Sequence, residues 1–392
     1  MPVPRSIAEH AAAVTALASP LPALSMPPEP GVVLAADAVA RLAVPPFDNS
    51  AMDGFLAHRE DLPGELRVVA DVPAGGRPAR LGRGEAARIM TGAPVDVDGD
   101  CVIPVEDTDH AAGPGPLPAT VRVPAYSGRD HIRPRGDNCS PGDVVLAAGS
   151  IIDAGALAAL VSAGVTEVQA HPRPRIAVIS SGDELIPAGQ PLAEGQIPDS
   201  NLPMLAALAR ANGAGEVLQL HASDRNGDFR AVLDEASAAA DVVVTSGGVS
   251  TGAFDVVKAV TSGDDMWFGS VSMKPGSPQG AGSWNGRPLL CLPGNPVAAF
   301  VSFHLFVVPV LRTLAGDTRP APRVRLAGGV DKFPAARGVT RVVPVRMSFD
   351  GEITAEPFHS RGSSHLVASL AGTNGLALIT TDDTVDTILT RN

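Results

Sequence analysis

The chain has 392 residues, which is enough for two or more domains with full-sized cores. Acidic residues outnumber basic ones by 42 to 30, and the formal net charge of −12 argues against nonspecific binding of nucleic acid. No apolar run is long enough to span a bilayer, the first residues lack the apolar core of a signal peptide, and Cys101, Cys139 and Cys291 lack metal-site spacing. We therefore expect a protein of the reducing cytoplasm that binds neither membranes nor nucleic acid.

An alanine-rich pattern over residues 6–17 predicts a helix, and five prolines between residues 20 and 30 predict an extended connection after it. Residues 45–55, PPFDNSAMDGF, then combine short polar side chains, among them Asp53, with apolar neighbours. This segment is either a loop built from turn-forming residues or part of a binding site.

Residues 66–145 contain short alternating segments that are separated by Gly and Pro turns, which predicts a β-rich barrel or sandwich. Within this module, Thr91 and Gly92 directly follow a predicted strand in RIMTGAPV. The segment RDHIRPRGDN, residues 129–138, gathers three arginines and a histidine before Asp137. This basic cluster is either a solvated hairpin tip or a rim that binds anions.

From residue 151 onward, helical and strand-like patterns alternate. A helix is predicted over residues 151–164, with Leu157, Leu160 and Val161 on one face. Strands follow over 175–180, 216–220 and 241–245, and helices over 200–212, with Ser200 as the expected N-cap, 228–239 and 254–260. This alternation predicts a parallel sheet with helices on both faces, which binds ligands beyond the carboxyl ends of its strands.

Residues 241–255, DVVVTSGGVSTGAFD, are typical of a buried strand, a glycine turn and a helix start. Paired glycines allow backbone N–H groups to approach a phosphate, and we expect Ser246, Gly247, Gly248 and Ser250 to form such a turn. Asp255 follows, where its carboxylate could hold a cation. For a lone glycine pair, an empty turn between strand and helix is the alternative.

Polar residues also follow the neighbouring strands. Glu184 lies in SSGDEL, Asp224 follows the next strand, and Lys274 lies in SVSMKPGSP. The segment PLLCLPGNPVAAF places Pro293, Gly294, Asn295 and Pro296 before an apolar helix over 297–311, which we expect to be buried. Carboxylates and a lysine around a glycine turn predict a site for Mg²⁺ and phosphate.

After Pro320, the pattern returns to strands and predicts a β domain of about 70 residues behind a proline-rich hinge. Residues 359–370, HSRGSSHLVASL, include Ser363 and His365. We reject a hydrolase triad here because no nucleophile elbow and no orienting acid accompany the pair.

The motifs PFDNSAMDG, RIMTGAP, the turn over residues 133–137, SSGDEL, TSGGVS, KPGxP, LPGNP and RGSS occur in the order seen in one family. The chain resembles the MoeA family of molybdopterin molybdenumtransferases, which includes the C-terminal domain of gephyrin, over residues 5–385. The resemblance implies a multidomain α/β and β protein. Its parts are a linker domain (residues 1–44 and 140–170), a β-rich insert (45–139), a MogA-like α/β domain with a parallel-rich sheet (171–319) and a C-terminal β-barrel (320–392).

The resemblance also implies a homodimer whose active cleft lies between the α/β domain of one subunit and the insert of the other. Its substrates would be molybdate and adenylylated molybdopterin, and its reaction would release AMP with the help of Mg²⁺. By matching motif, Glu184 and Asp255 would bind the metal, and Lys274 would neutralise anion charge. Asp53, Thr91, Asp137 and Asp224 would line the cleft, and Ser363 with the loop of Pro293 to Pro296 would shape the substrate end. Transient contacts with the molybdopterin-adenylating enzyme and with molybdoenzymes are further implications.

Two positions depart from the family pattern. Ser270 and Ser277 stand where many members carry lysine, which would weaken the binding of molybdate or phosphate. The alternatives are therefore a catalytically weak paralogue that acts as a scaffold or binding protein, or a MogA-type molybdopterin adenylyltransferase. The N-terminal and C-terminal β modules favour the transferase. A preference for tungstate over molybdate is left open.

Overall fold

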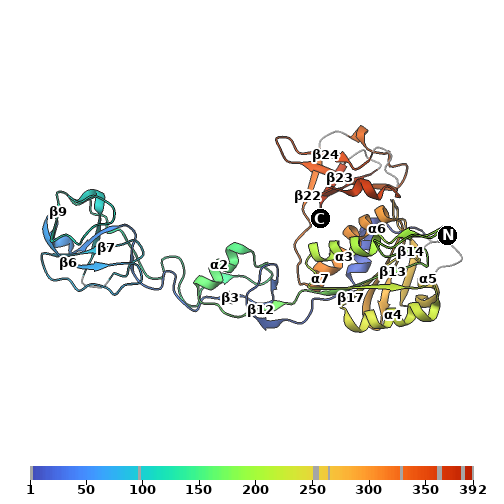
Figure 1. The fold of residues 1–392 in the computed structure, drawn as a ribbon, viewed down its shortest axis with the longest axis horizontal. Helices are drawn as coiled ribbons and strands as arrows, with labels where there is room; N and C mark the ends of the chain where they lie inside the picture. The colour runs from blue at the N-terminus through green and yellow to red at the C-terminus, as the bar shows by residue number, and fades with distance from the viewer. Residues whose placement is uncertain are drawn as a thin grey trace.

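The computed structural model describes residues 3–95, 99–249, 256–263, 265–326, 330–359, 364–380 and 385–390. The chain is elongated (Figure 1). A β-rich unit lies at one end, and an α/β unit with a C-terminal β-sheet lies at the other, with a small unit that contains α2 and β12 between them. Strands that precede the β-rich unit in the sequence pair in the middle unit with strands that follow it.

A six-stranded sheet forms the centre of the α/β unit, in the order β16–β13–β17–β21–β20–β18. The first four strands are parallel, and β20 is antiparallel to both of its neighbours. Val242, Val243 and Val244 are all fully buried because helices cover both faces of the sheet. The strands are β13 (Arg175–Ser181), β16 (Glu216–Ala222), β17 (Val242–Ser246), β18 (Met266–Ser270), β20 (Pro278–Trp284) and β21 (Arg287–Leu292).

The covering helices form two buried clusters, one on each face, as the alternating pattern predicts. Val244 packs with α3 and the last helices of the unit, whereas Val243 packs with α4 and α5. The helices are α1 (Ile7–Thr15), α3 (Asn201–Ala211), α4 (Asn226–Ala239), α5 (Val256–Thr261), α6 (Pro296–Ser302), the π-helical segment η3 (Phe303–Val307) and α7 (Val308–Leu314). Although we expected residues 1–44 to belong to the linker domain, α1 packs on η3 and α7, where its Val14 is buried.

We expected no apolar run long enough to span a bilayer, but the helix over Pro296–Leu314, at 19 residues and a mean hydropathy of 1.9, is long and apolar enough by length and composition alone. However, 72% of its most apolar window is buried inside the fold. Phe300, Phe303 and Phe306 lie in the same core cluster as the central strands. Packing in the core therefore explains its apolar composition, and the expectation of a buried helix is confirmed.

The C-terminal sheet has the order β19–β23–β25–β26–β22, and β24 also pairs with β23. Its first strand comes from the α/β unit, so this short strand ties the two units together. The elements are β19 (Met273–Lys274), β22 (Arg323–Leu326), β23 (Thr340–Ser348), β24 (Thr354–Pro357), β25 (Gly375–Ile379) and β26 (Val385–Leu389), with the 3-10 helices η4 (Val330–Lys332) and η5 (Val367–Leu370).

The β-rich unit is built on a five-stranded sheet in the order β8–β5–β7–β6–β9. Its elements are β5 (Gly54–Ala57), η1 (Arg59–Asp61), β6 (Gly64–Val72), β7 (Glu85–Ile89), β8 (Cys101–Pro104), η2 (Val105–Asp107) and β9 (Thr120–Val123), with the pair β4 (Asn49–Ser50) and β10 (Ile132–Arg133) beside it. The middle unit contains β1 (Leu24–Met26), β2 (Val33–Leu34), β3 (Ala38–Val39), β11 (Val144–Leu146), α2 (Ala154–Ser162) and β12 (Val168–His171). A further pair, β14 (Leu185–Ile186) and β15 (Ile197–Pro198), lies in the loop after β13.

Three local expectations are wrong. Val161 is 63% exposed, so the buried stripe of α2 does not include it. Ser200 precedes α3 in a helical conformation, and its side chain makes no capping bond; the carboxylate of Asp199 instead accepts a 3.0 Å hydrogen bond from Leu202 N–H. The strand near residue 145 pairs with β3 of the middle unit, whereas the strand pattern placed it in the β-rich module and the family resemblance placed residues 140–170 in the linker domain.

Candidate functional site

Three loops meet at the carboxyl edge of the parallel strands. The first follows β13, the second is the glycine turn after β17, and the third follows β21. Gly247 N–H donates a 3.0 Å hydrogen bond to Leu292 O. A Cβ on Gly294 would lie 3.4 Å from Gly247 Cα, and a Cβ on Gly247 would lie 3.3 Å from Ser181 O. The predicted glycine turn and the predicted LPGNP loop are thus in direct contact.

The glycines of this turn are needed for its backbone shape. Gly247 and Gly248 have φ angles of 101° and 69°, which L-residues with side chains rarely adopt. Ser246, the last residue of β17, is 2% exposed. Ser250 and Asp255, which we expected to complete the turn and bind the metal, lie outside the described residues.

Asn201, which sequence reasoning missed, joins two of these loops. Its side-chain Nδ2 donates 2.7 Å hydrogen bonds to Ser246 Oγ and to Gly294 O. The available signal was its position as the first residue of α3, because this helix starts at the same edge of the sheet as the glycine turn. A buried amide at a helix start, facing a glycine turn, is a reason to consider a role in positioning loops.

The LPGNP loop leads into α6, with Asn295 as the N-cap residue and Pro296 in the first turn. The N–H of Val297 donates a 3.3 Å hydrogen bond to Ser364 O, so Ser364, the last residue of the RGSS motif, lies against the start of this helix. Ser363, the residue we predicted to contribute there, lies outside the described part of the chain. The structure therefore brings its neighbour Ser364 to the loop of Pro293 to Pro296.

Carboxylates gather beside the first loop. Glu184 folds back over Gly182, where a Cβ would lie only 2.6 Å from Glu184 Oε2. Asp183 and Asp224 are linked reciprocally: Asp183 N–H donates to Asp224 Oδ2 at 3.2 Å, and Asp224 N–H donates to Asp183 Oδ1 at 3.3 Å. Two predicted residues, Glu184 and Asp224, are thus held near one another through Asp183.

Lys274 lies on β19, at the junction between the α/β unit and the C-terminal sheet. It pairs with Arg341 of β23 in parallel register, which places two cationic residues side by side. The turn that follows is anchored by Gln279, whose Nε2 donates to Gly276 O at 2.8 Å and to Ser302 Oγ at 2.7 Å. Lys274 is therefore fixed relative to α6, the helix that starts at the LPGNP loop.

A second cluster of predicted residues lies in the β-rich unit. Asp53 Oδ1 accepts 2.7 Å hydrogen bonds from the N–H and the hydroxyl of Thr91, and these bonds lower the pKa of Asp53 below its usual value. Ala51 N–H donates to His131 O at 2.8 Å, so the start of the segment over residues 129–138, which contains Asp137, lies beside the segment that contains Asp53. Asp137 itself is exposed.

The two clusters lie at opposite ends of one chain. Asp53 and Thr91 adjoin β5 and β7 at one end of the molecule, whereas the glycine turn and Glu184 adjoin β17 and β13 at the other (Figure 1). One subunit alone therefore does not bring Asp53, Thr91 and Asp137 to Glu184, Asp224 and Lys274.

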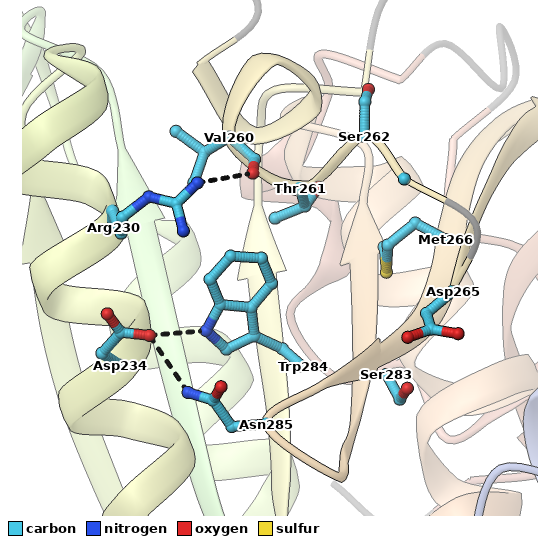
Figure 2. Close-up of a pocket in the computed structure, with 11 residues that line it drawn as sticks. Arg230, Asp234, Val260, Thr261, Ser262, Asp265, Met266, Ser283, Trp284 and Asn285 are labelled. Carbon is cyan, nitrogen blue, oxygen red and sulfur yellow. Dashed lines mark hydrogen bonds between the residues drawn. The ribbon is translucent and has the colours of Figure 1, made fainter.

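A cavity of about 510 Å³ lies away from these loops, between α4, α5 and the hairpin of β20 and β21 (Figure 2). Polar side chains that line this cavity form hydrogen bonds with other residues of the lining. Trp284 Nε1 donates to Asp234 Oδ1 at 2.8 Å, and Arg230 Nη2 donates to Val260 O at 3.4 Å. The hairpin turn closes the opposite edge of the sheet, so this cavity is separate from the candidate site.

Comparison with known proteins agrees with the arrangement of units. Three domain families match in order: "MoeA N-terminal region (domain I and II)" over residues 5–164, "Probable molybdopterin binding domain" over 177–313 and "MoeA C-terminal region (domain IV)" over 329–386. The chain is also 38% identical to molybdopterin molybdenumtransferase 2 of Mycobacterium tuberculosis, over 96% of each chain. The chain belongs to the MoeA family.

Other members agree with this assignment. Molybdopterin molybdenumtransferase of Staphylococcus aureus is 32% identical over 95% of this chain and 93% of its own length. The crystal structure of the MoeA protein of Pyrococcus horikosii superimposes with a TM-score of 0.76 at 26% identity, covering 99% of both chains. The predicted MoeA-type multidomain fold is thereby confirmed, and the residue boundaries of the four domains stay a prediction.

The magnesium ion implied by the MoeA resemblance can be tested against the donor atoms present. Asp183, Glu184 and Asp224 offer carboxylate oxygens, the ligand type that Mg²⁺ prefers. Among the described residues, no three or more His, Cys, Asp or Glu side chains come together in a group that could hold a metal ion by itself. This donor set fits Mg²⁺, because that ion commonly uses one or two carboxylates together with water and substrate phosphates.

Proposed function

We propose that this MoeA-family chain transfers molybdenum from molybdate to adenylylated molybdopterin. In this reaction the pyrophosphate link is hydrolysed and AMP leaves, and the two dithiolene sulfurs replace an oxygen of molybdate, which leaves as water with the two thiol protons, without a change of oxidation state. The observation that supports it is the meeting of the loops after β13, β17 and β21 at one sheet edge. Such an edge is where open α/β sheets bind their ligands.

In this proposal, different residues of the site bind the phosphates, the metal ion, molybdate and the pterin. Backbone N–H groups of the turn at Gly247 and Gly248 bind phosphate oxygens, as glycine turns before a helix do. Glu184, together with Asp255, holds Mg²⁺, which when bound offsets negative charge on the pyrophosphate. Lys274 attracts molybdate. The loop of Pro293 to Pro296, with Ser363, shapes the end of the site that receives the pterin.

The electrostatic problem is the approach of two anions. Two unit negative charges 4 Å apart repel by about 4 kcal/mol near a protein surface. Molybdate and the pyrophosphate group each carry more than one unit of negative charge, so their repulsion is larger. Fixed dipoles and cations in a restricted site compensate this repulsion without reorganising. Lys274 and Arg341, paired across β19 and β23, are suitable side chains for that purpose.

The test is an assay of AMP release by the purified chain with adenylylated molybdopterin and Mg²⁺, with and without molybdate. We expect AMP release that depends on molybdate, and molybdenum bound to the pterin product. Tungstate in place of molybdate measures oxyanion preference. Consumption of ATP with unmodified molybdopterin would instead indicate an adenylyltransferase, and binding without turnover would indicate a scaffold.

We further propose that the active form is a homodimer, because the β-rich unit and the α/β unit, which carry the two clusters, lie at opposite ends of one chain (Figure 1). Each cleft would combine the α/β unit of one subunit with the β-rich unit of its partner. Mixing the inactive variants Asp53→Ala and Glu184→Ala, with exchange of subunits, tests this arrangement. In a two-fold symmetric dimer with statistical exchange, half of the dimers regain one intact cleft, so activity returns to about one quarter of wild type. Absence of recovery in confirmed mixed dimers would contradict the shared cleft.

A cytoplasmic location and transient contacts with the enzymes that supply and receive the cofactor complete the proposal. Cys101, Cys139 and Cys291 all lie in the described part of the chain and form no disulfide there, which suits a reducing compartment.

A further inference from the structure

Asn201 is a buried side chain at the candidate site that no step described above uses. We infer that Asn201 is a positioning residue, which holds the glycine turn and the LPGNP loop in the relative placement that binds adenylylated molybdopterin. This inference rests on the proposed function for the identity of the substrate. The loop geometry on which it depends is independent of that function.

The orientation of the Asn201 amide is fixed by its partners. Gly294 contributes a backbone carbonyl, which can only accept a hydrogen bond, and it lies 2.7 Å from Nδ2. The flipped amide would place two acceptor oxygens against each other, so Nδ2 must face this carbonyl. The same nitrogen lies 2.7 Å from Ser246 Oγ and uses its second hydrogen there. An aspartate offers neither donor, and a serine offers only one.

This arrangement leaves the other end of the amide unpaired. Within the described part of the chain, Asn201 Oδ1 is buried and has no hydrogen-bond partner, and the residue is only 7% exposed. A buried acceptor without a partner opposes folding, and such groups in native proteins call for an explanation. Holding two loops together with two donated hydrogen bonds supplies that explanation.

The hydrogen bond from Asn201 also leaves the hydroxyl group of Ser246 able to donate to a ligand. Because Ser246 Oγ accepts the hydrogen bond from Asn201, its own hydroxyl hydrogen remains available for donation to a phosphate oxygen. Gly247 N–H bonds to Leu292 O, and a Cβ on Gly294 would lie only 3.4 Å from Gly247 Cα, so a shift of either loop displaces the other. Loss of the Asn201 bonds would therefore disturb both walls of the site together.

The first experiment needs no ligand. Asn201→Leu keeps a side chain of similar size and removes both donors. Hydrogen exchange of peptides covering residues 242–249 and 290–297 should become faster in this variant, because Gly247 N–H bonds to Leu292 O only while the loops stay together. The control is Asn212→Ala, which removes a 2.9 Å hydrogen bond from Asn212 to Leu208 O at the other end of α3. Exchange of the two loops that is unchanged in Asn201→Leu would overturn the inference.

The second experiment measures substrate. We expect Asn201→Leu to weaken the binding of adenylylated molybdopterin by about 10- to 100-fold, the loss typical of a displaced supporting residue. Its Tm should fall no further than that of Asn212→Ala. Wild-type affinity in Asn201→Leu would refute the positioning role. A wild-type protein that binds no adenylylated molybdopterin would refute the proposed function instead, and faster exchange in the variant would still support the mechanical link between the loops.

Discussion

Gly182 allows a direct test of the role of Glu184. Its φ angle is +147°, and it has no side chain to obstruct the Glu184 carboxylate folded over it. In Gly182→Ala the new Cβ would lie 2.6 Å from Oε2 and 2.9 Å from Cδ of Glu184, so this carboxylate must move by about 1 Å to regain ordinary van der Waals contact. A misplacement of about 1 Å can lower a catalytic rate about 100-fold, which corresponds to about 2.7 kcal/mol of transition-state stabilisation.

The matched control is Gly189→Ala in the same loop. Gly189 has a φ of +88°, and a Cβ there would meet no atom within 4 Å. Each alanine must adopt a positive φ, at a cost of about 1–3 kcal/mol, so both variants should lose comparable stability. Only Gly182→Ala displaces the carboxylate.

The assay is molybdate-dependent AMP release at saturating substrate, measured beside thermal unfolding. We expect activity about 100-fold below wild type in Gly182→Ala and close to wild type in Gly189→Ala. Equal activity in the two variants, with Gly182→Ala folded, would show that the position of Glu184 does not matter for turnover. Relief by added Mg²⁺ would indicate that the displaced carboxylate acts through metal binding.

Three further predictions concern pH and stability. Burial lowers the pKa of His10 from 6.5 to about 4, so below pH 6.5 the unfolded chain binds a proton that the folded chain does not bind. The free energy of unfolding therefore falls by up to about 3 kcal/mol as the pH falls toward 4. Urea unfolding should show a smaller loss of stability over this pH range in His10→Leu. Thr91→Val removes one donor to Asp53 and raises the pKa of that carboxyl, so the acidic limb of the activity profile should move to higher pH; an unchanged limb would exclude Asp53 as its origin. Asp241→Asn weakens three hydrogen bonds from Arg175 to a carboxylate only 8% exposed, and the free energy of unfolding should fall by about 1–3 kcal/mol, whereas no change in denaturation midpoint would contradict the stabilising role.

Much of the site follows from local sequence. The valine run before the glycine pair indicates a buried strand and a turn, and the structure has β17 followed by Gly247 and Gly248 at positive φ. The LPGNP loop before an apolar helix is likewise visible, because the proline, the N-cap residue and the apolar run are neighbours in the chain.

The tertiary structure decided which of these loops touch. Asn201 gives no motif, and its role depends on Ser246 and Gly294, each of which is distant in sequence from it and from the other. The same holds for Lys274, whose strand joins the C-terminal sheet through Arg341. Such contacts depend on how whole helices and strands pack against one another, so they cannot be predicted from the periodicity of a short segment.

The sequence by itself determined the order of the motifs, the family, the strands β13, β16 and β17 and the glycine turn, since these depend on neighbouring residues. Only the folded chain set the two clusters of acidic residues at opposite ends of the molecule, moved the first helix onto the α/β unit and placed the side-chain amide of Asn201 between two loops. The physical reason is that backbone conformation is set within a few residues, whereas burial and side-chain pairing are set by segments that meet only after folding.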